Sequence, residues 1–288
     1  MSVPPVDLNV PDDVRLRLTH GCLELIARRA GVRALHIKGV ALHPRLAAGR
    51  APSTDCDLLV DPAGVGACAA SLIDGGWEAR TRFEHGSVFG HAATYYHPRW
   101  GTVDLHRAFP GLDVGAQRAF ELLWDRRERI GLGSVDCAVP DLLAQRLILL
   151  VHAARDATGR RGHDVGVAWE ELDAEQRAQV EDLAAQLGAR VPLAFATGRP
   201  DAASGLPGEH LWAALHRDAD PTTVWRARLR DARGRSVRET MRVLVSALRV
   251  NPDHLELRLG RAPTRREMRQ EWWRRWGRAL RRWRGTDD

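Results

Sequence analysis

Helix-like and strand-like patterns alternate over the first 106 residues, and their order decides the class of fold. Apolar residues recur with a helical period in residues 11–30, 39–47 and 63–73. Short apolar or alternating runs bounded by glycine and proline predict strands over residues 34–37, 56–60, 77–83, 87–96 and 100–106. This order predicts an α+β domain over residues 1–139, with a mixed sheet and flanking helices.

The pattern changes at Pro140, after which helical periodicity dominates. Leucine and isoleucine spacing predicts a strong helix over residues 141–157. Residues 198–207 resemble a loop. Further helices are expected over residues 174–187, 223–230, 236–250 and 264–283. Residues 140–288 are therefore expected to form a second, mainly helical domain.

The bulk composition indicates a soluble, cytoplasmic protein. Of the 288 residues, 44% are hydrophobic and 28% are charged, which is usual for a globular chain. No apolar run approaches the roughly 18 residues of a membrane span, and residues 1–5 lack the features of a signal peptide. The four cysteines form no Cys-x-x-Cys pair, which disfavours zinc and dithiol redox motifs and is compatible with a reducing compartment.

Lys38 is the only lysine in a chain with 43 lysine and arginine residues. A single lysine in such an arginine-rich chain indicates a position where a compact ammonium differs from a planar guanidinium. It lies directly after the strand predicted over residues 34–37 and is followed by Gly39. The lysine–glycine pair is therefore a candidate for chemistry that arginine does not supply.

Three carboxylates lie on two of the predicted strands. Asp55 and Asp57 are two residues apart, so their side chains project from one face of a strand, roughly 6.5–7 Å apart at Cα. Asp104 has apolar neighbours and also points away from an apolar face. Carboxylates on neighbouring strands can share metal ions, and Mg²⁺ prefers carboxylate and phosphate oxygens. Together with Lys38 and Gly39, the three acids indicate a metal-dependent transfer site for a nucleoside triphosphate.

A second Asp-x-Asp pair, Asp218 and Asp220, shows how the same motif occurs without such a context. It lies in a polar segment before Pro221, with no glycine turn before it and no apolar strand after it. The pair at Asp55 and Asp57 differs in both respects. This contrast favours a functional interpretation over a solvated strand start.

Three motifs occur in order along the chain. They are Leu-His-Ile-Lys-Gly at residues 35–39, Thr-Asp-Cys-Asp-Leu-Leu-Val at residues 54–60 and Val-Asp-Leu-His at residues 103–106. Together they resemble the signature of an uncharacterised bacterial nucleotidyltransferase family of the DNA polymerase β-like superfamily. Segments similar to its helical part lie at residues 140–143, 152–155 and 163–165.

The resemblance implies a minimal nucleotidyltransferase fold with Mg²⁺ or Mn²⁺ held by Asp55, Asp57 and Asp104. Such an enzyme moves a nucleoside monophosphate from a triphosphate such as ATP to a hydroxyl and releases pyrophosphate. The acceptor stays open between a small molecule, an RNA end and a protein side chain. An alternative is a noncatalytic nucleotide- or RNA-binding protein on the same fold.

The nucleotide side of this site is assigned to Lys38, Gly39, Arg50 and His106. Gly39 would keep the backbone close to phosphate at a helix N-terminus, and Lys38 would add a point charge on the triphosphate. The spacing from Gly39 to Asp55 is longer than is usual in the superfamily. Arg50 lies five residues before Asp55, where relatives tend to carry an arginine at four. His106 has three open roles: contact with phosphate, orientation of a carboxylate, or simple hydrogen bonding at a strand end.

The C-terminal quarter is strongly basic, with 19 arginines and 8 acidic residues over residues 221–288. The apolar residues on one face of its last predicted helix are Trp272, Trp276, Leu280 and Trp283. Three interpretations are open. This helix packs on the protein's own core, or residues 264–284 bind RNA through arginine–phosphate contacts and stacking, or they lie on an anionic membrane surface.

Overall fold

The computed structural model describes residues 10–83, 90–155, 159–248, 250, 252, 255, 259, 261 and 263–284. The fold is α+β, as the sequence predicts. Two compact units can be distinguished by their internal contacts. The first comprises Met1–Arg80, Ala92–Phe109 and Gly115–Gln145, and the second comprises Thr81–His91, Pro110–Val114 and Arg146–Asp288. The division into domains at residue 140 stays a prediction.

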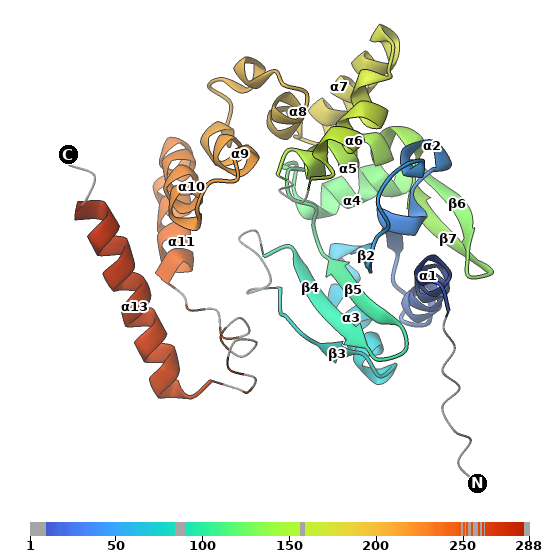
Figure 1. Ribbon diagram of the computed structural model, residues 1–288, viewed down its shortest axis with the longest axis horizontal. Helices are drawn as coiled ribbons and strands as arrows, with labels where there is room; N and C mark the ends of the chain where they lie inside the picture. The colour runs from blue at the N-terminus through green and yellow to red at the C-terminus, as the bar shows by residue number, and fades with distance from the viewer. Residues whose placement is uncertain are drawn as a thin grey trace. The chain divides into compact units, whose positions relative to one another are not determined.

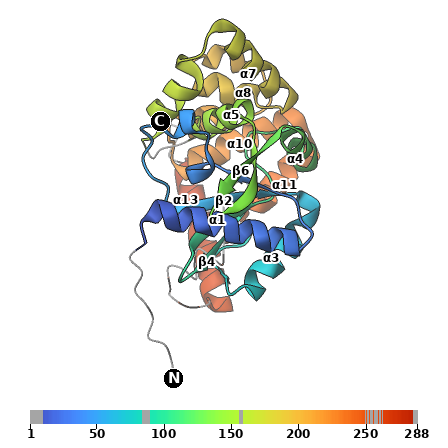
Figure 2. The same ribbon diagram turned by 90° about the vertical axis from the view of Figure 1, so that its right-hand side faces the viewer.

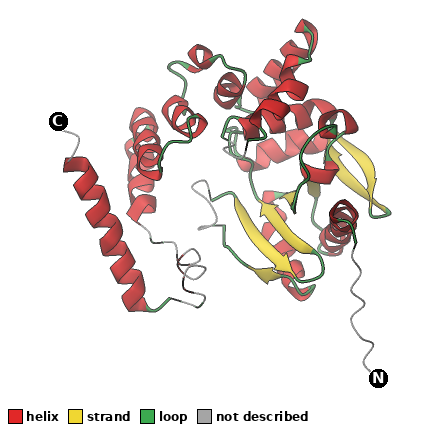
Figure 3. Ribbon diagram, in the orientation of Figure 1, coloured by secondary structure: helices red, strands yellow, loops and turns green. Residues whose placement is uncertain are grey.

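A five-stranded mixed sheet forms the centre of the first unit (Figures 1 and 3). Its spatial order is β1-β2-β5-β4-β3, in which β2 and β5 are parallel and the other neighbours are antiparallel. The strands are β1 (Ala34–Ile37), β2 (Asp55–Val60), β3 (Glu78–Ala79), β4 (Ala92–His97) and β5 (Gly101–His106). The central β2–β5 pair thus unites two strands that are more than 40 residues apart in the chain.

The two faces of this sheet have different roles. Helix α1 (Asp12–Arg29) contacts α3 (Val65–Asp74) as well as β1 and β2, and Figure 2 shows it running along the sheet. The side chain of Cys56 lies on this helix-covered face, where its Sγ is 3.7 Å from the carbonyl oxygen of Leu16. Because side chains alternate along a strand, the neighbouring Asp57 points to the opposite face.

A second, two-stranded sheet follows the first along the chain. It consists of the antiparallel hairpin β6 (Arg127–Leu132) and β7 (Val135–Pro140), preceded by α4 (Ala116–Asp125). The sequence patterns did not reveal these three elements. Residues Arg127–Arg129 are charged and exposed, so β6 lacks the apolar alternation that identifies a strand. β7 contacts both β1 and α1, which places the hairpin against the sheet.

The helix predicted over residues 39–47 is wrong. The structure has a 3₁₀ turn at Gly39–Ala41 and a separate four-residue helix α2 at Pro44–Ala47. The break occurs because proline disfavours the helical conformation of the preceding residue, and His43 is extended at φ −56° and ψ 140°. The expected helix N-terminus at Gly39 is therefore only the start of a single 3₁₀ turn.

Two strand predictions were too long. The strand predicted over residues 77–83 is reduced to Glu78–Ala79, and the one predicted over residues 87–96 is observed at Ala92–His97. Residues 84–89 lie outside the described part, and so does the end of the helix predicted over residues 141–157. That helix, α5, is described at Leu142–Ala153.

The rest of the described chain is helical, as predicted for residues after 140. Sequence periodicity missed α6, α8 and α9, which are short. After α5 come α6 (Arg161–Val165), a π-helical turn (Gly166–Glu170), α7 (Ala174–Gln186), α8 (Arg190–Ala196), a 3₁₀ turn (Pro200–Ala203), α9 (Glu209–His216), α10 (Pro221–Arg235), α11 (Val237–Leu248) and α13 (Arg265–Arg284). Within the described ranges, every helix is too short or too polar to span a bilayer.

Helix α13 carries the arginine- and tryptophan-rich segment. Trp272 packs edge-on against Trp273, with ring centroids 4.7 Å apart, and lies 5.6 Å from Trp276. Trp273 is 66% exposed. The side chains of Leu280 and Trp283 lie outside the described part. Trp272, Trp273 and Trp276 therefore form a local cluster. Packing on the core, RNA binding and membrane binding all stay predictions.

Candidate active site

Asp57 lies at the centre of the candidate site, on β2, and is only 5% exposed. Its Oδ1 accepts a hydrogen bond from Lys38 Nζ at 2.8 Å and lies 2.7 Å from His106 Nε2. Burial alone would raise the pKa of this carboxyl. The Lys38 ammonium and the His106 hydrogen bond outweigh burial and hold the pKa of Asp57 well below its usual range. Asp57 is therefore an ionised, buried carboxylate.

Asp104 lies directly beside Asp57, because the two residues are register partners on the parallel strands β2 and β5. Its Oδ1 accepts a hydrogen bond from Thr94 Oγ1 at 2.7 Å. Burial is the main cause that raises the pKa of Asp104. The negative charges of Asp57 and Asp55 raise it further, against the opposing hydrogen bond from Thr94. This crowding of negative charge is what a bound cation would relieve.

Asp55 begins β2 and, by strand alternation, lies on the same face as Asp57. Its Oδ1 accepts a hydrogen bond from Ser53 Oγ at 2.8 Å. Among the described residues on this face, the ligand atoms that lie within 4.8 Å of one another belong to Asp57, Asp104 and His106. Asp55 stands at the edge of this group. The carboxylate oxygens of this group fit Mg²⁺ or Mn²⁺, which prefer oxygen ligands.

Lys38 reaches Asp57 from an unusual backbone conformation. Its φ of 59° and ψ of −168° fall in a region that is adopted almost only by glycine. The next residue, Gly39, also has a positive φ of 50°, and a Cβ there would lie 3.2 Å from the Cβ of Ser53. The turn is thus strained at Lys38 and closely packed at Gly39. Such strain persists only where the surrounding structure imposes it, and it is found most often at functional sites.

Two substitutions at Lys38 measure this strain. Both Lys38→Gly and Lys38→Ala remove the ammonium, so they differ mainly in the backbone. We expect the glycine variant to be more stable by about 1 kcal/mol, because relief of strain of roughly 1–3 kcal/mol outweighs glycine's entropic cost of roughly 0.5–1 kcal/mol. Chemical denaturation measures the difference. An alanine variant as stable as the glycine variant would show that Lys38 is unstrained.

The other residues assigned from sequence occupy different positions. His106 is 3% exposed and lies 2.7 Å from Asp57 Oδ1, a contact compatible with orienting this carboxylate. Its contact with phosphate stays a prediction. Arg50 lies half-buried in the loop between α2 and β2, and its role in phosphate binding stays a prediction. Sequence reasoning missed the hydroxyl donors Ser53 and Thr94. Thr94 could be found only from the pairing of β4 with β5, which puts it opposite Asp104.

A mixed sheet with neighbouring acids on parallel strands, next to a lysine–glycine turn, is the arrangement expected of a nucleotidyltransferase domain. The comparison with protein families agrees with this class. The family model described as an uncharacterised nucleotidyltransferase matches residues 15–201, and the chain belongs to this family. No curated protein matches the chain.

Proposed function

We propose that the protein transfers a nucleoside monophosphate from a nucleoside triphosphate to a hydroxyl acceptor and releases pyrophosphate. The observation that supports this most directly is the pairing of Asp57 with Asp104 across β2 and β5, with a ligand atom of His106 within 4.8 Å of both. This acid pair lies in a domain of the nucleotidyltransferase family. The family supports nucleotidyl transfer in general, and the residue roles below are our proposal.

Asp57, Asp104 and Asp55 are the residues we assign to a divalent cation, Mg²⁺ or Mn²⁺. When bound, such a cation supplies positive charge to the phosphate oxygens and to the leaving pyrophosphate. Asp57 is suited to hold it because its carboxylate stays ionised despite burial. Asp104 is suited because its raised pKa reflects burial and unrelieved repulsion from Asp57 and Asp55.

Lys38 is the group we assign to the triphosphate. In the structure its ammonium neutralises Asp57 at 2.8 Å, and its side chain is 13% exposed. A cation bound by Asp57 would take over this neutralisation and leave the ammonium available for phosphate oxygens. His106 keeps Asp57 oriented through Nε2, whereas Gly39 allows the turn to pack against Ser53. The chain's own residues thus provide charge, orientation and a close backbone approach.

The position of the label on the triphosphate tests this reaction. The protein is incubated with Mg²⁺, cell extract and each of the four ribonucleoside triphosphates, labelled at either the α- or the γ-phosphate. Nucleotidyl transfer predicts that an acceptor gains label from the α position only, with pyrophosphate released. Label transferred from the γ position would indicate a kinase and overturn the proposal. Nucleotide binding without pyrophosphate release would favour the noncatalytic alternative.

A further inference from the structure

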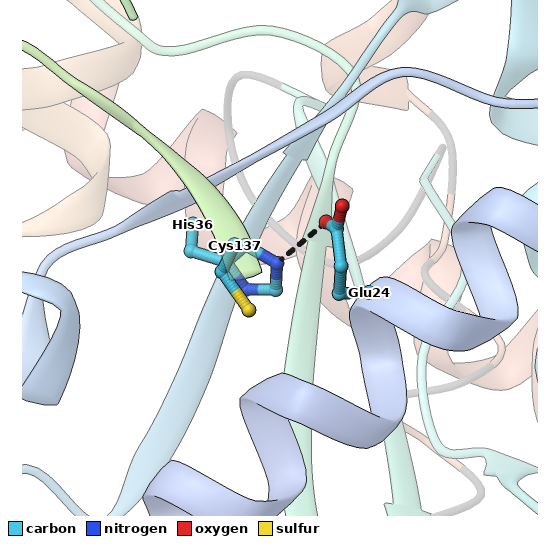
Figure 4. A group of neighbouring side chains, drawn as sticks. All are labelled: Glu24, His36 and Cys137. Carbon is cyan, nitrogen blue, oxygen red and sulfur yellow. Dashed lines mark hydrogen bonds and ion pairs between the residues drawn. The ribbon is translucent and has the colours of Figure 1, made fainter. Parts of the chain in front are cut away.

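A second group of potential metal ligands lies in the first unit, on the helix-covered side of the sheet. Glu24 on α1, His36 on β1 and Cys137 on β7 converge there, as Figure 4 shows. One ligand atom from each lies within 4.8 Å of the others. Glu24 is 5% exposed, and the other two residues are fully buried. Two consecutive elements, α1 and β1, and the distant strand β7 thus bring an oxygen, a nitrogen and a sulfur donor together.

We propose that Glu24, His36 and Cys137 bind a zinc ion, at a site that is separate from the acids of the candidate active site. Thiolate and imidazole ligands select zinc over magnesium, and zinc also accepts a carboxylate oxygen. The site lies on the other face of the sheet from Asp57, because His36 is paired with Leu58, the strand neighbour of Asp57. The donor set and the location both distinguish it from the acid site.

The carboxylate of Glu24 is held so that its two oxygens have different partners. Oε1 accepts a hydrogen bond from Arg28 Nε at 2.8 Å and lies 3.7 Å from Arg129 Nη1. Oε2 lies 3.1 Å from His36 Nε2 and faces the other potential ligands. Carboxylates that bind metals are commonly oriented by such hydrogen bonds from their second oxygen. The arginines therefore fix Glu24 in position and leave Oε2 for the ion.

The ring of His36 is held in a similar way by His20. The two Nδ1 atoms are 2.8 Å apart, and His20 is fully buried. Burial lowers the pKa of His20 well below its usual range, so His20 is a neutral ring. A histidine that binds metal through one nitrogen donates a hydrogen bond from the other. With zinc on Nε2, the His36 Nδ1–H would donate to His20 Nδ1.

The charges and protons balance in the zinc-bound form. Without metal, we assign one proton to His36 Nε2, facing Glu24, and the proton between the two Nδ1 atoms to His20. Binding shifts both rings to their other tautomer, so each keeps one proton. Cys137 binds as a thiolate and loses its thiol proton to solvent. The thiolate and the Glu24 carboxylate then neutralise the two positive charges of zinc, which a buried site requires.

Other interpretations of the cluster explain less. Burial raises the pKa of Cys137 to about 12, which is opposite to the shift of a nucleophilic or redox-active thiol. A hydrogen-bonded chain through Glu24, His36 and His20 needs no cysteine. The zinc interpretation uses all four side chains. It also accounts for the position of the cluster, because an ion here joins α1 and the β6–β7 hairpin to the strand that leads into Lys38.

Cobalt substitution on the full-length protein tests the site. Cobalt bound by a thiolate gives a charge-transfer absorption band that carboxylate sites lack. We expect the wild-type protein to bind one equivalent with this band and to show a raised Tm with zinc. Cys137→Ala should lose the band and weaken zinc binding by more than about 100-fold. Loss of a residue that only orients a ligand typically weakens metal binding by about 10- to 100-fold, so loss of a ligand should cost more.

Control variants separate this proposal from loss of folding and from the acid site. Cys68→Ala removes another fully buried thiol, on α3, and should keep the band. Asp57→Asn should also keep it, because Asp57 is on the opposite face. Glu24→Gln preserves shape and should weaken binding. Wild-type protein that takes up no zinc and gives no Tm shift, or a Cys137→Ala variant that retains the band, would overturn the proposal.

Discussion

Asp57→Asn is expected to lower the rate of nucleotidyl transfer by roughly 10²- to 10³-fold or more, the loss seen when a preorganised charge-stabilising group is removed. A neutral amide cannot neutralise a divalent cation, and Asp57 is a carboxylate that stays ionised despite its burial. The fold should persist because asparagine has the same shape, and the relieved repulsion with Asp104 offsets part of the lost ion pair with Lys38. Transfer of α-labelled nucleotide and circular dichroism measure the two effects.

The second Asp-x-Asp pair supplies a matched control for this substitution. Asp218 is exposed and has a φ of 50°, a conformation that asparagine tolerates well. Asp218→Asn therefore makes the same chemical change in the second unit, at an exposed residue outside the sheet, and should leave transfer unchanged. Equal activity of Asp57→Asn and Asp218→Asn would show that Asp57 is not part of the catalytic machinery.

Lys38→Met is expected to lower kcat/KM for the triphosphate by roughly 10²-fold, as for the loss of one well-placed charge at a reacting phosphate. Methionine keeps much of the apolar stem but removes the ammonium that lies 2.8 Å from Asp57. Lys38→Arg should restore the charge without full activity, because a planar guanidinium does not replace a compact ammonium. Steady-state kinetics and Tm together distinguish a catalytic loss from unfolding.

Chemical labelling gives an independent measurement at Lys38. It is the only lysine in the chain, so amine-specific labelling away from the N-terminus reports on one site. ATP with Mg²⁺ should protect this amine if the ammonium contacts the triphosphate. The same degree of labelling with and without nucleotide would contradict the assignment, as would a Lys38→Met variant that binds nucleotide normally but has a lower Tm.

The sequence alone determined the elements that have a clear apolar period. The predicted helix over residues 11–30 and the strands over residues 34–37, 56–60 and 100–106 agree closely with the structure. Their patterns are local, since each buries a regular set of side chains regardless of its partner. Composition singled out Lys38 as a potentially functional residue, because it is the only lysine in an arginine-rich chain and this is visible without a fold.

Only the tertiary structure decided which of these residues meet. Strand register put Asp57 beside Asp104, and the turn at Lys38 brought its ammonium onto Asp57. The β6–β7 hairpin was not predicted because its first strand is charged. The approach of Cys137 on β7 to His36 could therefore not be predicted either. Spacing along the chain carries no information on such contacts, since they depend on how separate elements pack. Periodicity therefore defined the pieces of this fold, whereas long-range pairing defined both of its candidate metal sites.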